Sequence, residues 1–184
     1  MLTFGKDRLA QTGERLCDGT RARKRSKHQW FELQDTCAYH EKFSEERLFW
    51  QTLTGMGQFS YFSEGENTFC LSSAYMLTGK YIKFLCGILN SRLVAWFMRE
   101  TAVNWGDKVK WLKTSVDLIP VPIPNENTND SIIKLVDQII NAKTENHDIQ
   151  TSELERKIDT IVFSLYGLSS SEIEKIINLT NGYD

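Results

Sequence analysis

Two clusters of basic residues with aromatic neighbours have the composition of a surface that binds phosphate groups. The first cluster precedes Trp30 and Phe31 and consists of Arg21, Arg23, Lys24, Arg25 and Lys27. The second lies beside Trp105 and Trp111 and consists of Lys108, Lys110 and Lys113. Lysine and arginine neutralise phosphates and release their counterions, and the arginine fork can also hold the edge of a guanine. The clusters therefore predict nucleic-acid binding, with two solvated loops on aromatic anchors as the alternative.

The charge of the chain is divided unequally along its length. The first thirty residues contain eight basic and three acidic residues, whereas residues 121–184 contain five basic and eleven acidic ones. The formal net charge is only −2 because the two ends compensate each other. This asymmetry favours a front end that faces a polyanion and a back end that faces solvent or a partner protein.

The sequence offers no complete catalytic or metal-binding motif. The segment "TGMGQ" at residues 54–58 is the nearest approach to a nucleotide-binding loop, but it lacks the third glycine and predicts a turn. Glu155 and Lys157 match half of a nuclease signature, without the Pro-Asp that would supply the other metal ligand. Histidines and cysteines are scattered, which argues against a zinc site or a disulfide framework. We expect a chain that is non-catalytic by itself, with no metal or cofactor, and keep a compact nuclease as an alternative.

The middle of the chain predicts a small sheet followed by a helix. Four short apolar segments separated by glycines predict strands or, alternatively, buried helix fragments: "RLFWQTL", "QFSYF", "TFCL" and "AYML". Residues 80–100 carry apolar side chains at helical spacing and predict one central helix. Pro120, Pro122 and Pro124 exclude a helix and predict an edge strand over residues 116–124. The expected fold class is α+β, with a small mixed or antiparallel sheet and a central amphipathic helix.

The C-terminal part predicts a helical hairpin and a short third helix. Apolar spacing predicts helices around residues 132–140 and 154–165. The second would open on a capping box between Ser152 and Glu155 and end at Gly167. A capping box between Ser169 and Glu172 predicts the third helix. No apolar run reaches the roughly 18 residues of a membrane span and no signal peptide follows Met1, so we expect a soluble, cytoplasmic protein without a membrane partner.

Five segments, in order along almost the whole chain, resemble the motifs of one protein family. They are "FGKDRLAQTG" at residues 4–13, "KHQWFELQDTCAYHEKF" at 27–43, "KYIKFLCGILNSRLVAWFM" at 80–98, "LIPVPIP" at 118–124 and "LERKIDTIVFSLYGLSSSEI" at 154–173. The family is the TaqI-like C-terminal specificity domain, the target-recognition part of type IIG restriction-modification enzymes and related adenine-specific DNA methyltransferases. Its members often have a "GGG" run where this chain has "NWGDKVKWLK" at residues 104–113, so the second cluster departs from the family pattern.

The resemblance implies double-stranded DNA as a partner and a methyltransferase or nuclease domain elsewhere in the parent polypeptide or complex. Residues 1–124 would form the DNA-binding target-recognition domain and residues 125–184 a C-terminal helical hairpin extension. A protein-interaction module that docks a partner through Ile139, Ile140 and Ile161 is the alternative.

We expect the loop of residues 21–27 to grip phosphates or enter a groove, with Trp30 and Phe31 buried behind it. The second cluster would approach the same duplex from another side. Phosphate contacts position such a module, whereas contacts to base edges give it specificity. The candidates for reading base edges are Arg23, Arg25, Gln29 and Lys110.

Overall fold

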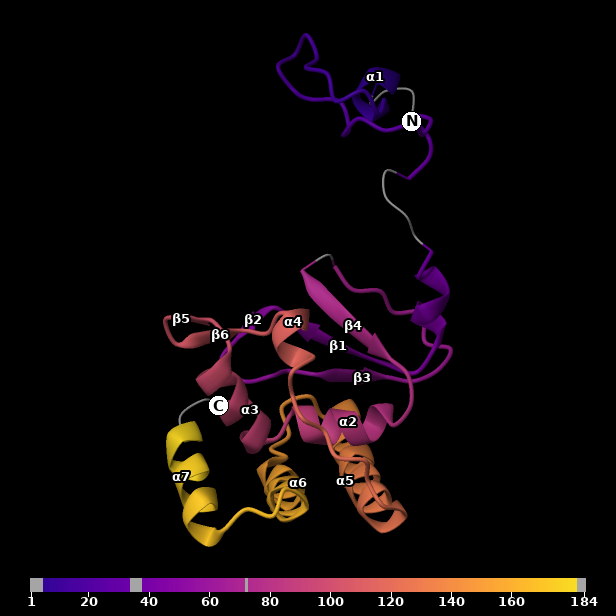
Figure 1. Cartoon of the computed structure of the whole chain (residues 1–184). Coiled ribbons are helices and arrows are strands. Elements are labelled where there is room, and N and C mark those ends of the chain that lie inside the picture. Colours follow the sequence, from indigo (N-terminus) through magenta and orange to yellow (C-terminus); the bar gives the residue numbers. More distant parts are fainter. Residues whose placement is uncertain (1–4, 34–37, 72, 182–184) are drawn as a thin grey trace. The chain divides into compact units, whose positions relative to one another are not determined.

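The computed structural model describes residues 5–33, 38–71 and 73–181 (Figure 1). The chain divides into two compact units, Met1–Lys42 and Phe43–Asp184. The division at residue 124 stays a prediction from the sequence. No helix within the described ranges is long and apolar enough to cross a bilayer.

The strands of the second unit form two small antiparallel sheets. The first has the order β3-β1-β4, with β3 at Ser60–Phe62, β1 at Arg47–Gln51 and β4 at Ala74–Thr78. The second has the order β2-β6-β5, with β2 at Leu53–Thr54, β6 at Lys108–Lys110 and β5 at Asn104–Trp105. Strand β1 is central in its sheet, and four of its five residues are buried. The expected α+β class with a small antiparallel sheet is confirmed.

Helices make up most of the remaining regular structure. Their bounds are Lys6–Leu9 for α1, His40–Ser44 for the 3-10 segment η2, Ile82–Leu89 for α2, Arg92–Thr101 for α3, Lys113–Val116 for α4, Glu126–Glu145 for α5, Ser152–Leu165 for α6 and Ser170–Thr180 for α7. Helix α5 packs on α2 and α6, and α7 packs on α3. In Figure 1, α2 and α3 lie between the strands and the C-terminal helices. The expected C-terminal helices are thus present, and they share the core of the second unit.

Helices α2 and α5 approach each other closely at Gly87. A Cβ atom added to Gly87 would lie 2.5 Å from Cγ2 of Ile132 and 3.3 Å from Cγ2 of Val136. Such a distance is well below van der Waals contact, so only glycine lets the two helices come this close. Gly87 therefore sets the spacing between the central helices and the C-terminal helices.

The single helix expected over residues 80–100 is wrong, because the chain breaks between α2 and α3. The Asn90 side chain donates to the carbonyl of Phe59 and accepts from its amide, both at 2.9 Å. Ser91 caps α3, its hydroxyl accepting from the Val94 amide. Ser91 has an extended backbone, which places the two helices at an angle. Apolar periodicity alone hides this break, since both helices present apolar faces to one core.

The edge strand expected over residues 116–124 is also wrong, since no strand forms there. The prolines remove the amides that a ladder needs. The segment is fixed instead by the Tyr166 hydroxyl, which donates to the Pro120 carbonyl at 2.5 Å, and by Ile119 and Val121 against the core. The segment "TFCL" forms no strand either, and its Thr68 carbonyl accepts from the Arg47 side chain.

The two predicted capping boxes have different outcomes. Ser169 and Glu172 form the expected box at the start of α7. Helix α6 begins one residue earlier than expected, with Thr151 at the N-cap, and its hydroxyl donates to the Glu155 carboxylate at 2.6 Å. The box expected between Ser152 and Glu155 is therefore wrong. Gly167 follows the last residues of α6 with φ +67°, as a helix end requires.

Candidate nucleic-acid interface

Residues 13–23 of the first unit form a narrow hairpin held by backbone hydrogen bonds. The bonds run from the amide of Gly13 to the carbonyl of Arg23 at 2.8 Å, from Leu16 to Thr20 at 2.8 Å and from Ala22 to Glu14 at 2.9 Å. At the tip, the hydroxyl and amide of Thr20 donate to the Asp18 carboxylate at 2.7 and 2.9 Å, which lowers the pKa of that carboxyl. The hairpin places Arg21 and Arg23 of the first basic cluster on a defined turn of chain.

Gln11 ties this hairpin to the segment that follows it. Its side chain is only 5% exposed, and its amide nitrogen donates to the carbonyls of Gln29 and Glu32, both at 3.0 Å. The Ser26 hydroxyl donates to its amide oxygen at 2.5 Å, and the Ser26 amide donates to its backbone carbonyl at 3.0 Å. One buried amide thus fixes both ends of residues 26–32, a role that no local sequence motif indicates.

The cations of the first cluster lie on the outside of this frame. Arg23 is half-buried, and its guanidinium donates to the Glu32 carbonyl at 3.1 Å. The other predicted residues of this region are exposed: Arg21, Lys24, Arg25, Lys27 and Gln29. Their charges are therefore available to an anion in solvent. A solvated loop that binds no ligand would expose them in the same way.

The burial expected for Trp30 and Phe31 is wrong. Phe31 is 69% exposed, and Trp30 is half-buried with its ring 5.6 Å from that of Phe31 in an edge-to-face arrangement. The physical reason is that the described part of the first unit buries one apolar side chain, that of Ala22, and so offers no core to receive two aromatic rings. The loop is fixed by hydrogen bonds rather than by an aromatic anchor.

The second cluster lies on a β-hairpin formed by β5 and β6. Trp105 pairs with Lys108 across the strands, and Lys110 pairs with Leu53 of β2. Because alternate residues of a strand share a face, these four side chains lie on one face of the small sheet, and Val109 lies on the other. Val109 is buried, Trp105 is 66% exposed, and the Lys110 ammonium lies 4.8 Å from the centroid of the Trp105 ring.

Trp111 anchors this hairpin in the core of the second unit. Its side chain is fully buried, its amide donates to the Thr52 carbonyl at 2.9 Å, and its carbonyl accepts from Nε1 of Trp50 at 2.9 Å. Its ring packs edge-to-face against Phe59 at 5.8 Å. Gly57 belongs to the segment for which the sequence predicts a turn. A Cβ on Gly57 would lie 2.8 Å from the Trp111 ring, so the lack of a side chain there makes room for this anchor.

Lys113 does not share the face of the other two lysines. It begins α4, where its ammonium forms an ion pair with Asp117 four residues on. Both side chains are more than half exposed, so this pair contributes little to stability. The structure therefore brings Lys108 and Lys110 together with Trp105 and places Lys113 on the following helix.

The model of the TaqI-like C-terminal specificity domain matches residues 9–121, which include both basic clusters. The chain belongs to this family. No curated protein matches the chain.

The fold of this chain is similar to that of a solved restriction-modification enzyme. It is the type IIL restriction-modification enzyme MmeI in complex with DNA, with a TM-score of 0.59 and 16% sequence identity. The similarity covers 75% of this chain and 21% of that chain. This chain thus spans about a fifth of the length of the neighbour that it resembles.

Arg47 is a buried cation of the specificity domain that the sequence did not distinguish from surface arginines. It is fully buried and donates to four backbone carbonyls, those of Glu45, Ser63, Glu66 and Thr68, at 2.8, 3.3, 2.7 and 3.2 Å. Its guanidinium also lies over the rings of Phe49 and Phe62 at 5.6 and 5.5 Å. Arg47 therefore shapes the loop between β3 and β4 and is not accessible to a ligand.

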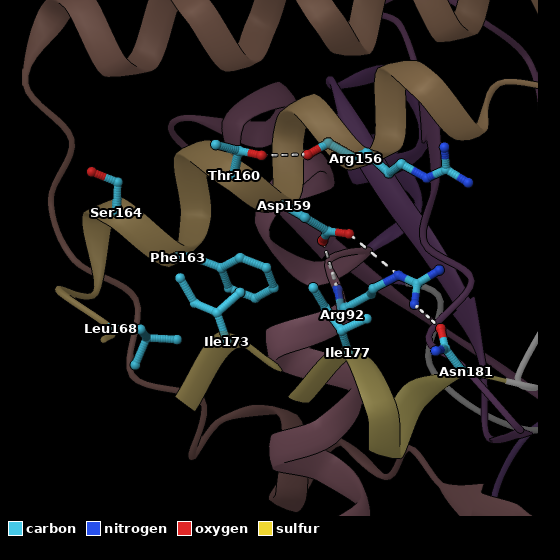
Figure 2. A pocket seen from close by; sticks show the side chains of 10 residues that line it. All are labelled: Arg92, Arg156, Asp159, Thr160, Phe163, Ser164, Leu168, Ile173, Ile177 and Asn181. Carbon is cyan, nitrogen blue, oxygen red and sulfur yellow. Dashed lines mark hydrogen bonds and ion pairs between the residues drawn. The ribbon is translucent and has the colours of Figure 1, made fainter. Parts of the chain in front are cut away.

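A groove of about 690 Å³ lies between α3, α6 and α7 (Figure 2). Asp159 on its floor accepts from the Arg92 amide at 2.9 Å, and its other oxygen lies 3.5 Å from Nε of Arg92. Arg92 also donates to Asn181 at 2.9 Å. Burial raises the pKa of the Asp159 carboxyl to about 6, although these contacts favour its ionised form. Because both carboxylate oxygens already face Arg92, Asp159 joins α6 to the start of α3 and is explained without a ligand.

The described residues contain no cluster of side chains suited to a metal ion. The half signature at Glu155 and Lys157 has a structural explanation. Glu155 accepts from Thr151, and Lys157 pairs with Glu153 at 3.0 Å, one turn earlier on α6. These contacts are those of an exposed helix face.

Proposed function

We propose that this chain is the DNA target-recognition module of a type IIG restriction-modification enzyme. It would bind double-stranded DNA sequence-specifically and present the site to a methyltransferase or nuclease outside this chain. The observation that carries the proposal is the family match over residues 9–121, because these residues include both basic clusters. The similar enzyme MmeI, described in complex with DNA, supports the same role.

The exposed cations of the first cluster suit phosphate contacts. Arg21 projects from the hairpin, and Lys24, Arg25 and Lys27 project from the segment that follows it, which Gln11 holds at Ser26 and Gln29. Arg23 is held against the Glu32 carbonyl, which leaves part of its guanidinium for a base edge or phosphate. Gln29 is exposed beside it, and Lys108 and Lys110 would contribute a second basic surface.

Salt dependence and charge reversal test the proposal. A fluorescent duplex that contains the recognised sequence, selected from a random library, should bind with an affinity that falls steeply as salt is raised. Arg21→Glu with Arg25→Glu should weaken binding by roughly tenfold or more and reduce the salt slope by about 2. These two side chains are exposed, so folding should be unaffected.

Lys134→Glu with Lys175→Glu is the matched control, since it makes the same change of charge on exposed positions of α5 and α7. Equal effects of the two double variants would mean that the first cluster affects DNA binding only through the net charge of the chain. Binding that ignores salt and both variants would exclude DNA as the ligand. Salt-tolerant capture of a protein through Ile139, Ile140 and Ile161 would then favour the alternative of an interaction module.

A further inference from the structure

We propose that the exposed face of the β2-β6-β5 sheet is a stacking platform for an unpaired DNA base. The platform consists of Trp105, Lys108, Lys110 and Leu53. This inference rests on the proposed function, and it adds a chemical class of ligand and a named contact residue. It concerns the second unit alone.

The first argument is the geometry of the exposed ring. Trp105 is 66% exposed although it lies in a strand, while Trp111 in the same segment is fully buried. Burial does not stabilise an indole that lies largely in water. A role in packing therefore does not explain why the Trp105 ring is placed here. The Lys110 ammonium at 4.8 Å from the ring centroid holds the ring by a cation–π contact. The ring is thus oriented before any ligand arrives.

The second argument is the charge that surrounds the ring. Lys108 is directly opposite Trp105 across the strands, and Lys110 follows on the same face. Asp107 in the turn is the one acidic residue among residues 104–113. Bases stack on aromatic side chains whereas lysines hold the phosphates that flank them, and every base has a face that can stack. An exposed ring flanked by lysines therefore suits an unpaired base, which no longer stacks on its neighbours in the duplex.

The third argument is the rigidity of the support. The hairpin turns at Gly106, which has φ +63°, and Lys110 donates its amide to Val103 at 2.9 Å. Val109 on the opposite face is buried, and Trp111 fixes the end of β6 in the core. A rigid platform loses little entropy when a base stacks on it.

The experiment compares two fluorescent DNA duplexes that both contain the selected recognition sequence and differ only in a three-nucleotide adenine bulge. We expect the chain to bind the bulged duplex more tightly than the matched one. Trp105→Ala should weaken binding to bulged DNA roughly tenfold and change binding to matched DNA less than about twofold. Trp105→Phe, which retains an aromatic face, should restore part of the loss.

Three results would overturn the platform. Equal binding of wild type to both duplexes would show that an unpaired base is not recognised. Equal binding of wild type and Trp105→Ala to bulged DNA would show that the ring does not carry the contact, and would leave the proposed function standing if matched DNA still binds in a salt-dependent way. Failure of wild type to bind either duplex would remove the proposed function as well.

Discussion

The two basic clusters have similar chemistry but different supports. The first lies on a hairpin in which backbone and Gln11 hydrogen bonds do the positioning, and Ala22 is the apolar side chain buried in the described part of its unit. The second lies on strands that Trp111 anchors in an extensive apolar core. Hydrogen bonds fix direction but contribute modestly to stability, whereas close-packed apolar groups contribute more and tolerate change poorly.

This contrast separates a loop held by polar contacts from a platform held by an apolar core. A loop held by polar contacts can exchange its outward side chains without disturbing a core. A platform mounted on a buried tryptophan depends on the whole second unit.

Trp111→Ala should produce the largest effect on the second unit. Removal of a fully buried indole leaves a cavity beside Phe59 and Gly57, and we expect the free energy of unfolding to fall by about 3–5 kcal/mol. Urea denaturation followed by circular dichroism measures it. Trp105→Ala, six residues earlier, should change stability by less than about 0.5 kcal/mol. Similar losses for both variants would contradict the division between anchor and platform.

Gly87→Ala should give a smaller loss of stability, located between α2 and α5. The new methyl group would lie 2.5 Å from Ile132, whose branched side chain cannot easily move. Overpacking of this kind costs about 1–3 kcal/mol, and the better helix propensity of alanine offsets up to about 1 kcal/mol of it. Gly55→Ala is the control, because nothing lies within 4 Å of its added Cβ and its φ is not positive. A stabilised Gly87→Ala variant would show that the helices can separate freely.

Local signals predicted much of the fold, and contacts distant in sequence account for what was missed. The capping box at Ser169 and the helix end at Gly167 depend on neighbouring residues, and both were predicted. The break between α2 and α3 was not, because Asn90 is satisfied by Phe59, which lies far from it in sequence. Periodicity reports which face is apolar and not whether the backbone is continuous.

The candidate site shows the same limit. Composition identified both basic clusters, but it could not separate Trp105 from Trp111, since the exposed face is decided by the pairing of β6 with β2 and β5. The prediction that Phe31 is buried is wrong, because the described part of the first unit has no apolar core to receive it. Gln11 was missed because its partners lie 15 to 21 residues away.

Gln11→Ala should loosen the first unit and leave the second unchanged. The variant removes the amide that bonds the carbonyls of Gln29 and Glu32 and the hydroxyl of Ser26, although each of these groups keeps one other hydrogen bond, and we expect local stability to fall by about 1–2 kcal/mol. Hydrogen exchange should accelerate at the amides of Gly13 and Ser26. Gln29→Ala is the control, because the side chain of Gln29 is exposed and its backbone carbonyl remains. Unchanged exchange in Gln11→Ala would mean that backbone bonds alone hold the hairpin.

Two aspartates extend the comparison to titration. The hydroxyl and amide of Thr20 lower the pKa of Asp18 in the first unit, whereas burial raises that of Asp159 to about 6 in the second. Carboxyl NMR should therefore show Asp18 titrating below 3.8 and Asp159 near pH 6. The folded pKa of Asp159 exceeds its unfolded value, so protonation favours the folded state. The contribution of Asp159 to stability should decline as pH rises from about 4 to about 6, whereas the contribution of Asp18 should rise across the acidic range.

Asp159→Asn keeps an acceptor for the Arg92 amide and removes the ionisation, so wild type should lose stability relative to this variant as pH rises from about 4 to about 6. A constant difference between the two would mean that Arg92 fully compensates the buried charge.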